Sequence, residues 1–188
     1  MNDIQKEYKR WLLNATKDSD LTSELKQMSN MQKEDAFYRN LSFGTGGLRG
    51  VIGAGTNRIN IYTIAKASLG LANYLNKHYE NPSVVIGYDS RNKSDLFAQT
   101  AAGIFASSGI HVYIYSCLLP VPCVSYGVRH LKASAGVMIT ASHNPSIYNG
   151  YKVYGDDGCQ ITTNAADEIL AEIESLDVFS DVRLGHFD

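Results

Sequence analysis

The chain has 188 residues, of which 44% are hydrophobic and 19% are charged, with a formal net charge of −2. This length is enough for one domain with an appended segment, and a core of that size forms without a disulfide or metal staple. The charge balance argues against a nucleic-acid-binding protein, and no stretch is long and apolar enough to predict a membrane span. The N-terminus lacks the apolar stretch of a signal peptide, so we expect a cytoplasmic protein whose cysteines, Cys117, Cys123 and Cys159, are free, partly buried thiols.

The N-terminal part of the chain has a helical pattern. Apolar residues recur at helical spacing, and Tyr8 and Trp11 lie three positions apart on one face. Asp20 and Thr22 are candidate N-caps of a second helical segment. We therefore expect residues 1–40 to form a helical arm that packs on the main domain, with Trp11 as its core anchor.

The next stretch, FGTGGLRGVIGAGTNRIN (residues 43–60), is too rich in glycine for a regular helix. It predicts a glycine-rich loop that leads into a hairpin, with Val51 and Ile52 on one strand and Ile59 on the other.

From residue 61 onward, helical patterns alternate with short apolar runs that are typical of buried strands. We expect helices over 61–79, 93–108, 120–131 and 164–176, and strands over 84–88, 111–115, 133–139 and 151–155. This alternation predicts an α/β fold: a three-layer α/β/α domain with a mostly parallel mixed sheet, plus the N-terminal helical arm. We assign residues 41–180 to this domain. The aperiodic tail, 181–188, is expected to be a linker to further domains.

The sequence TASHNP (140–145) follows the buried run ASAGVMI, so it lies where a strand ends. Ligands collect at such strand ends in open α/β sheets. Ser142 is either a turn residue or a residue that carries or attacks a phosphoryl or acyl group. The Gly-x-Ser-x-Gly pattern of serine hydrolases is absent, and the adjacent His143 is badly placed to act as the base of a triad.

Three other motifs could contribute to a site at Ser142. GTGGLRG (44–50) matches neither a dinucleotide-binding nor a P-loop pattern, but Arg49 among its glycines could grip a phosphate; alternatively, it is a surface arginine beside a turn. Lys152 is a candidate cation or proton shuttle, or a solvated strand lysine. The DSR segment at 89–91 either braces the serine loop or caps the next helix through Ser90 or Asn92.

Metal sites have little support in the sequence. Asp156 and Asp157 precede a glycine and predict a turn rather than a metal site. The histidines outside the serine loop share no metal-ligand spacing, so we expect no zinc or iron centre.

TASHNP, followed by YNGYKVYGDDG and preceded by FGTGGLRG, resembles the α-D-phosphohexomutase superfamily. YKRW in the arm, GAGTNRINIYT and YDSR are most similar to the bacterial phosphoglucomutases of the branch that also holds phosphopentomutases. The resemblance extends from about Trp11 to the last predicted helix.

This resemblance implies a chemistry for the site. Ser142 would be phosphorylated in the resting enzyme and would pass its phosphoryl group to a hexose monophosphate, with glucose 1,6-bisphosphate as the bound intermediate and Mg²⁺ held partly through the phosphate on Ser142. Lys152 would be an acid/base that also contacts phosphate, Arg49 and Thr45 would bind phosphate, and His143 would line the site as a further catalytic residue. The expected partners are the hexose phosphate substrate and the remaining domains of the same enzyme.

One departure limits what the chain can do alone. Members of this superfamily have four domains, whereas this sequence resembles the first and has no Asp-Gly-Asp-x-Asp run to complete a magnesium site. We therefore expect the 188 residues alone to have little or no mutase activity. Phosphopentomutase and phosphomannomutase remain alternatives within the superfamily, and a non-catalytic phosphate-binding module is the alternative from another class.

Overall fold

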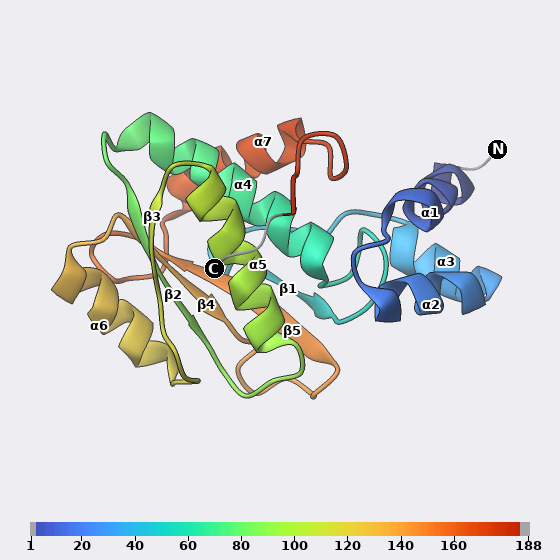
Figure 1. The fold of residues 1–188 in the computed structure, drawn as a ribbon, viewed down its shortest axis with the longest axis horizontal. Helices are drawn as coiled ribbons and strands as arrows, with labels where there is room; N and C mark the ends of the chain where they lie inside the picture. Colours follow the sequence, from blue (N-terminus) through green and yellow to red (C-terminus); the bar gives the residue numbers. More distant parts are fainter. Residues whose placement is uncertain (1–2, 185–188) are drawn as a thin grey trace.

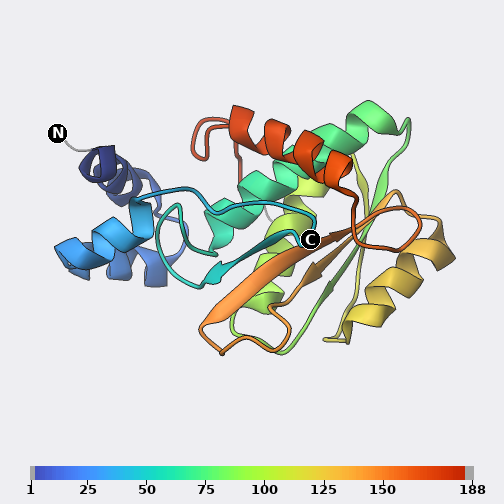
Figure 2. The same ribbon diagram turned by 180° about the vertical axis from the view of Figure 1, so that it is seen from behind.

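The computed structural model describes residues 3–184 and contains a helical arm followed by a five-stranded mixed sheet with helices on both faces (Figure 1, Figure 2). Its elements are α1 (Asp3–Asn14), α2 (Ser19–Gln27), α3 (Asn30–Phe37), β1 (Leu48–Val51), α4 (Ile61–His78), β2 (Ser83–Tyr88), α5 (Ser94–Ser107), β3 (His111–Ile114), α6 (Val121–Leu131), β4 (Ala135–Ile139), β5 (Tyr148–Tyr154) and α7 (Thr163–Ser175). None of these helices is long and apolar enough to cross a bilayer.

The strands lie in the order β1-β5-β4-β2-β3. β2 pairs in parallel with β3 and β4, whereas β5 runs antiparallel to both β4 and β1. Four strands therefore point the same way. α4, α5 and α7 cover one face, and α6 packs on β2 and β4 on the other, which confirms the predicted three-layer α/β fold.

Local sequence explains most element boundaries. The Asn60 side chain accepts hydrogen bonds from the Tyr62 and Thr63 N–H groups, and the Thr63 hydroxyl accepts one from the Asn60 N–H, so a capping box begins α4. Pro122 lies in the first turn of α6, where its missing N–H is not needed. The strands β2 and β4 are almost entirely buried, as their apolar runs predict. All three cysteines are free thiols, as expected, but only Cys123 is partly buried; Cys117 and Cys159 are exposed because they lie in loops.

The hairpin expected within residues 43–60 is absent. β1 instead pairs with β5, opposing Leu48 to Tyr151, and Ile52 and Ile59 form only an isolated bridge. Residues 53–58 turn toward the arm, where the Ala54 N–H donates to the Glu24 carboxylate at 2.9 Å. The hairpin prediction was wrong in its pairing: Ile59 does lie beside β1, and its N–H donates to the Val51 carbonyl at 2.9 Å, but the bridge to Ile52 is parallel and the strand partner of β1 is β5.

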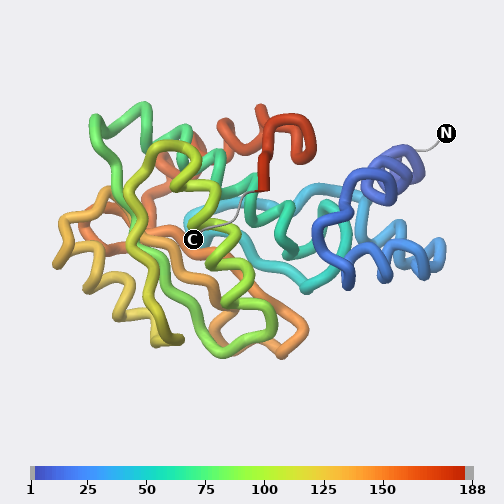
Figure 3. Tube along the Cα trace, viewed as in Figure 1, coloured from blue at the N-terminus to red at the C-terminus, as the bar shows by residue number. Residues whose placement is uncertain are grey.

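The arm consists of three short helices, α1 to α3, at one end of the molecule (Figure 3). The residue that caps the N-terminus of α2 differs from the prediction. The cap of α2 is Asp18, whose Oδ1 accepts hydrogen bonds from the N–H groups of Asp20 (2.9 Å) and Leu21 (3.3 Å); neither Asp20 nor Thr22 caps it.

Trp11 joins the arm to the rest of the chain. Its side chain is fully buried, and it makes edge-to-face ring contacts with Phe37 of the arm, Tyr62 of α4 and Phe179 after α7. Tyr62 and Phe179 also contact each other, which closes the aromatic cluster. This confirms Trp11 as the anchor of the arm.

Asp177, just after α7, also ties the arm to the domain. Its carboxylate pairs with the Arg10 guanidinium of α1 and accepts hydrogen bonds from the N–H groups of Phe179 (3.0 Å) and Ser180 (2.9 Å). Burial by itself raises the pKa of Asp177. The hydrogen bonds and the Arg10 charge outweigh this effect and hold that pKa at about 2, below its ordinary value of 3.8.

We therefore expect Asp177 to contribute to acid stability. A carboxyl whose pKa is lower in the folded state stabilises the fold above its unfolded pKa and loses that contribution as the pH falls from about 5 to 2. Because the side chain is 39% exposed, we expect about 1 kcal/mol. Urea denaturation at a series of pH values measures this contribution. Between about pH 5 and pH 2 the free energy of unfolding of Asp177→Asn should fall less than that of the wild type. An unchanged acid profile would contradict this assignment.

Candidate active site

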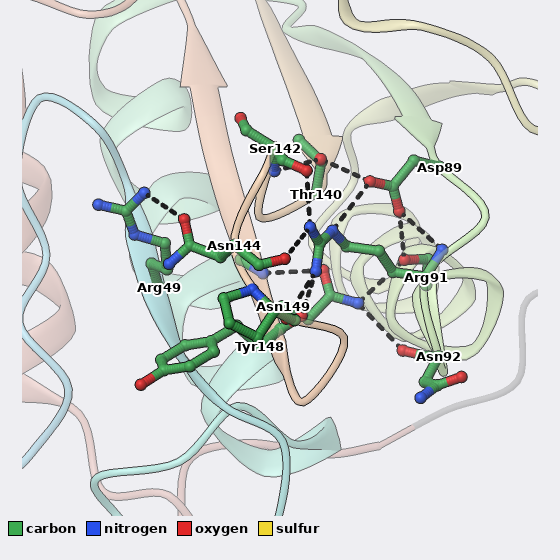
Figure 4. Close-up of polar contacts among 12 residues, drawn as sticks. Arg49, Asp89, Arg91, Asn92, Thr140, Ser142, Asn144, Tyr148 and Asn149 are labelled. Carbon is green, nitrogen blue, oxygen red and sulfur yellow. Dashed lines mark hydrogen bonds and ion pairs between the residues drawn. The ribbon is translucent and has the colours of Figure 1, made fainter.

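Ser142 lies in the loop that joins β4 to β5. Its side chain is exposed, and its φ of 55° places a non-glycine residue in the left-handed region. The Ser142 N–H donates to the Thr140 hydroxyl at 2.9 Å, and that hydroxyl donates to Asp89 Oδ2 at 2.6 Å. The uncommon backbone conformation is thus held by a hydrogen-bonded chain that starts at the end of β2 (Figure 4).

Arg91 holds the same loop from the side. Its Nη2 donates to the carbonyl oxygens of Ser142 and Asn144, both at 2.6 Å, and its Nη1 donates to those of Pro145 (3.1 Å) and Tyr148 (3.0 Å) (Figure 4). One planar guanidinium therefore fixes four carbonyls of a single turn.

A buried polar layer supports this brace. Asn149 and Ser94 are fully buried, and the Asn149 amide donates to the Ser94 hydroxyl (2.9 Å) and to the Asn92 carbonyl (3.1 Å). The Ser94 hydroxyl and the Arg91 N–H donate in turn to Asp89 Oδ1. No buried side-chain nitrogen or oxygen in the described part of the chain lacks a partner, so the loop rests on a satisfied network.

The structure shows that the DSR segment braces the loop. The alternative, a helix cap from Ser90 or Asn92, is wrong, because the N-cap position of α5 is Lys93 and its side chain makes no capping bond.

Lys152 reaches Ser142 from β5. Its Nζ donates to the Ser142 hydroxyl at 2.9 Å, and the side chain is half-buried. Lys152 lies opposite Met138 of β4, and Met138 packs with α6, so Lys152 emerges on the face of the sheet that α6 partly covers. Strand alternation thus directs the lysine toward the loop that follows β4.

The glycine-rich stretch brings Arg49 to the same place. Arg49 lies on β1 opposite Gly150 of β5. Because Gly150 is two residues before Lys152 on that strand, Arg49 and Lys152 lie on the same face of the sheet. The Arg49 Nη1 donates to Asn144 Oδ1 of the serine loop at 3.2 Å (Figure 4). Gly47 packs so closely on β5 that a Cβ there would lie 1.8 Å from the Tyr151 carbonyl oxygen. The glycine is therefore what lets β1 lie beside the strand that carries Lys152.

Thr45 and His143 lie at the margins of this arrangement. Thr45 is at the exposed tip of the Gly44–Gly47 turn, and His143 is exposed beside Ser142. Neither side chain forms a hydrogen bond or ion pair with the described residues, so both are free to meet a ligand.

The charges around Ser142 suit a phosphate. Three cations, Arg49, Arg91 and Lys152, contact Ser142 or its loop, whereas the nearby carboxylate of Asp89 is engaged by Thr140 and by its own segment. A phosphoserine carries nearly two negative charges and is stabilised by such a cationic surround.

Comparison with known proteins agrees with this geometry. Residues 40–178 match the model of the family described as phosphoglucomutase/phosphomannomutase, alpha/beta/alpha domain I. The chain belongs to this family. It is 45% identical over 166 residues to a phosphoglucomutase of Staphylococcus aureus (strain bovine RF122 / ET3-1), covering 88% of this chain and 30% of that one. It is 47% identical over 145 residues to a phosphoglucomutase of Staphylococcus epidermidis, covering 77% and 27%.

Solved structures of the phosphoglucomutase/phosphomannomutase family share the fold. A protein of Thermus thermophilus, provisionally assigned as a phosphomannomutase, superposes with a TM-score of 0.70 and 32% identity over 79% of this chain and 32% of that one. A Paramecium phosphoglucomutase, parafusin, at 19% identity and a TM-score of 0.60, has the same fold over 72% of this chain and 26% of its own. The chain spans about 30% of the length of its curated relatives, which confirms the resemblance to a first domain.

Sequence reasoning missed Thr140, Asn144 and Asn149, all of which position the serine loop of this family member. Thr140 and Asn144 lie inside TASHNP. Polar residues are common in turns, so nothing in the motif distinguished these two as residues that position the loop. Asn149 follows in a predicted loop, but β5 begins at Tyr148, three residues earlier than expected, and buries it. A polar residue in the first buried position of a strand was the available signal.

Proposed function

We propose that the chain is the phosphoserine-bearing domain of a cytoplasmic phosphoglucomutase that interconverts glucose 1-phosphate and glucose 6-phosphate. The observation that carries this proposal is the Ser142 hydroxyl, exposed in a rigid loop and 2.9 Å from Lys152 Nζ. The choice of glucose rests on the relatives named phosphoglucomutase; the Thermus neighbour makes mannose phosphates the alternative.

The geometry supports specific roles. In the forward step, the bond between phosphorus and Ser142 Oγ breaks while a sugar hydroxyl oxygen bonds to phosphorus, so glucose 1,6-bisphosphate forms. The proton that the sugar hydroxyl loses ends on Ser142 Oγ: Lys152 would give its proton to the departing Ser142 oxygen and take up the one that the sugar hydroxyl releases, and the same proton movement would run in reverse when the other phosphate returns to the serine. In this proposal Arg49 and Thr45 bind the phosphate and His143 is a further catalytic residue at the site; the contact of Arg49 with the serine loop and the exposed side chains of Thr45 and His143 support these roles.

A magnesium ion fits this site only in part. The described residues contain no cluster of three His, Cys, Asp or Glu side chains that could hold a metal ion. Phosphate and carboxylate oxygens are the ligands that Mg²⁺ prefers, so the phosphate on Ser142 would supply one ligand and the others would come from beyond these residues. When bound, the ion would neutralise phosphate charge.

The proposed domain organisation follows the same logic. In this proposal residues 1–40 form the arm, 41–180 carry the phosphoserine, and 181–188 link to the remaining domains, although residues 1–2 and 185–188 lie outside the described residues. The match of the family model to 40–178 and the greater length of the relatives support this division. The remaining domains would complete the cleft, so we expect the 188 residues alone to convert glucose 1-phosphate poorly or not at all.

The mass of the protein isolated from its source cells, intact and as a digest spanning Ser142, tests the proposal. We expect a longer chain with one phosphate on Ser142 and none in a Ser142→Ala variant made in the same cells. Turnover of a panel of hexose and pentose phosphates by the longer protein would then identify the sugar. An unmodified Ser142 in a native product that ends near Asp188 would instead indicate a non-catalytic phosphate-binding module.

A further inference from the structure

Lys93 has an unusual place between β2 and α5. It occupies the N-cap position of α5 with a left-handed backbone, φ 59°, which side-chain-bearing residues seldom adopt. Its side chain does not cap the helix. The ammonium instead crosses to the arm, where it lies 3.1 Å from Asp18 Oδ2 and 2.8 Å from Asp20 Oδ2.

The contact on the arm is a rigid one. Asp18 uses its other oxygen, Oδ1, to cap α2, and its side chain is only 9% exposed. Burial by itself lowers the pKa of Lys93, but the hydrogen bonds to Asp20 and Asp18 outweigh this effect and raise it. Lys93 in turn lowers the pKa of Asp20. Lys93 Nζ therefore contacts the capped start of α2, through the nearly buried Asp18 and through Asp20, whose side chain is 74% exposed.

The segment that carries Lys93 is also the one that holds the serine loop. Arg91, two residues earlier, donates to four carbonyls of that loop, and the Asn92 carbonyl accepts from Asn149 (Figure 4). The Ser94 N–H donates to the Arg91 carbonyl at 3.1 Å, which closes a tight turn around Lys93. Residues 89–94 therefore lie between the arm and the serine loop. Only one residue, Asn92, separates Lys93, which contacts the arm, from Arg91, which contacts the loop.

We propose that Lys93 is a positioning residue through which the N-terminal arm sets the place of Arg91 and, with it, the Ser142 loop. The arm does not need Lys93 for its attachment, because the buried Trp11 cluster and the Glu24–Ala54 bond already hold it. What Lys93 adds is a fixed distance between α2 and the turn that carries Arg91. The consequence for phosphoryl transfer rests on the proposed function; the mechanical coupling does not.

Hydrogen–deuterium exchange of the 188-residue chain tests the coupling without any sugar or phosphate. Lys93→Met keeps the aliphatic stem and removes the charge, and Lys93→Arg restores a cation. Lys77→Met is the matched control, because it breaks an exposed lysine–glutamate pair between α4 and α7, away from the serine loop. We expect amides of residues 140–148 to exchange about fivefold faster in Lys93→Met and at the wild-type rate in the other two variants.

A purely structural role would give a different pattern. If Lys93→Met speeds exchange in α2 but leaves residues 140–148 unchanged, Lys93 only attaches the arm and the proposal is overturned. A uniform increase over the whole chain, β2 and β3 included, would also overturn it. Should Lys93→Met not fold, Asp20→Asn removes the more exposed partner and should give the same local change at about half the size. An unphosphorylated Ser142 would remove the proposed function but would not affect this result.

Discussion

Arg91→Ala is expected to lower the free energy of unfolding by about 3 kcal/mol, measured by urea denaturation. The Arg91 side chain is 13% exposed, and its guanidinium donates to four loop carbonyls and pairs with Asp89 at 3.5 Å. Removing it leaves these acceptors with at most water, and it leaves Asp89 without its cation. The Ser142 backbone, which has an unfavourable φ, would then relax.

Arg91→Lys should recover little of this stability, because a point cation cannot reach carbonyls on both sides of a planar fork. Arg129→Ala is the matched control, since Arg129 is an exposed arginine on α6 that donates to one carbonyl, that of Ser125. We expect that control to stay within about 0.5 kcal/mol of wild type. An Arg91→Ala variant as stable as the Arg129→Ala variant would show that the brace does not hold the loop.

Gly47→Ala is expected to destabilise the chain by about 2–4 kcal/mol and to displace β1 from β5. Gly47 has a φ of 75°, and a Cβ there would lie 1.8 Å from the Tyr151 carbonyl oxygen and 3.0 Å from Lys152 Cα. Both are backbone atoms of β5, so no side-chain rotation can relieve the overlap. Arg49, two residues later, would move away from Asn144 together with the strand.

The control for this substitution lies in the adjacent residue. At Gly46 a Cβ would meet no atom within 4 Å, so Gly46→Ala should change the free energy of unfolding by less than about 1 kcal/mol. Urea denaturation and the amide NMR shifts of residues 48–51 distinguish the two variants. Equal stabilities of the Gly46 and Gly47 variants would mean that the close approach of this turn to β5 is not required.

The serine loop shows how far sequence reasoning reaches in a site. TASHNP identifies Ser142, and the DSR segment is a candidate brace, because both motifs follow apolar strand runs and parallel strands end at one edge of a sheet. That Arg91 serves four carbonyls at once could not be predicted. Those oxygens are up to 57 residues away in sequence, and only the folded loop turns them toward one guanidinium.

The sequence by itself determined the alternation of helices and strands, the burial of Trp11 and the position of Ser142 at a strand end. These features follow from periodicity and from contacts between residues a few positions apart, which operate within one element. Only the tertiary structure decided that β1 pairs with β5, that Asp18 rather than Asp20 caps α2, and that Lys93 joins the arm to the serine loop. The pairing and the Lys93 bridge join residues far apart in the sequence, so they depend on which surfaces the whole fold brings together. The cap depends on where the chain leaves α1, since a start at either aspartate satisfies the same local rule.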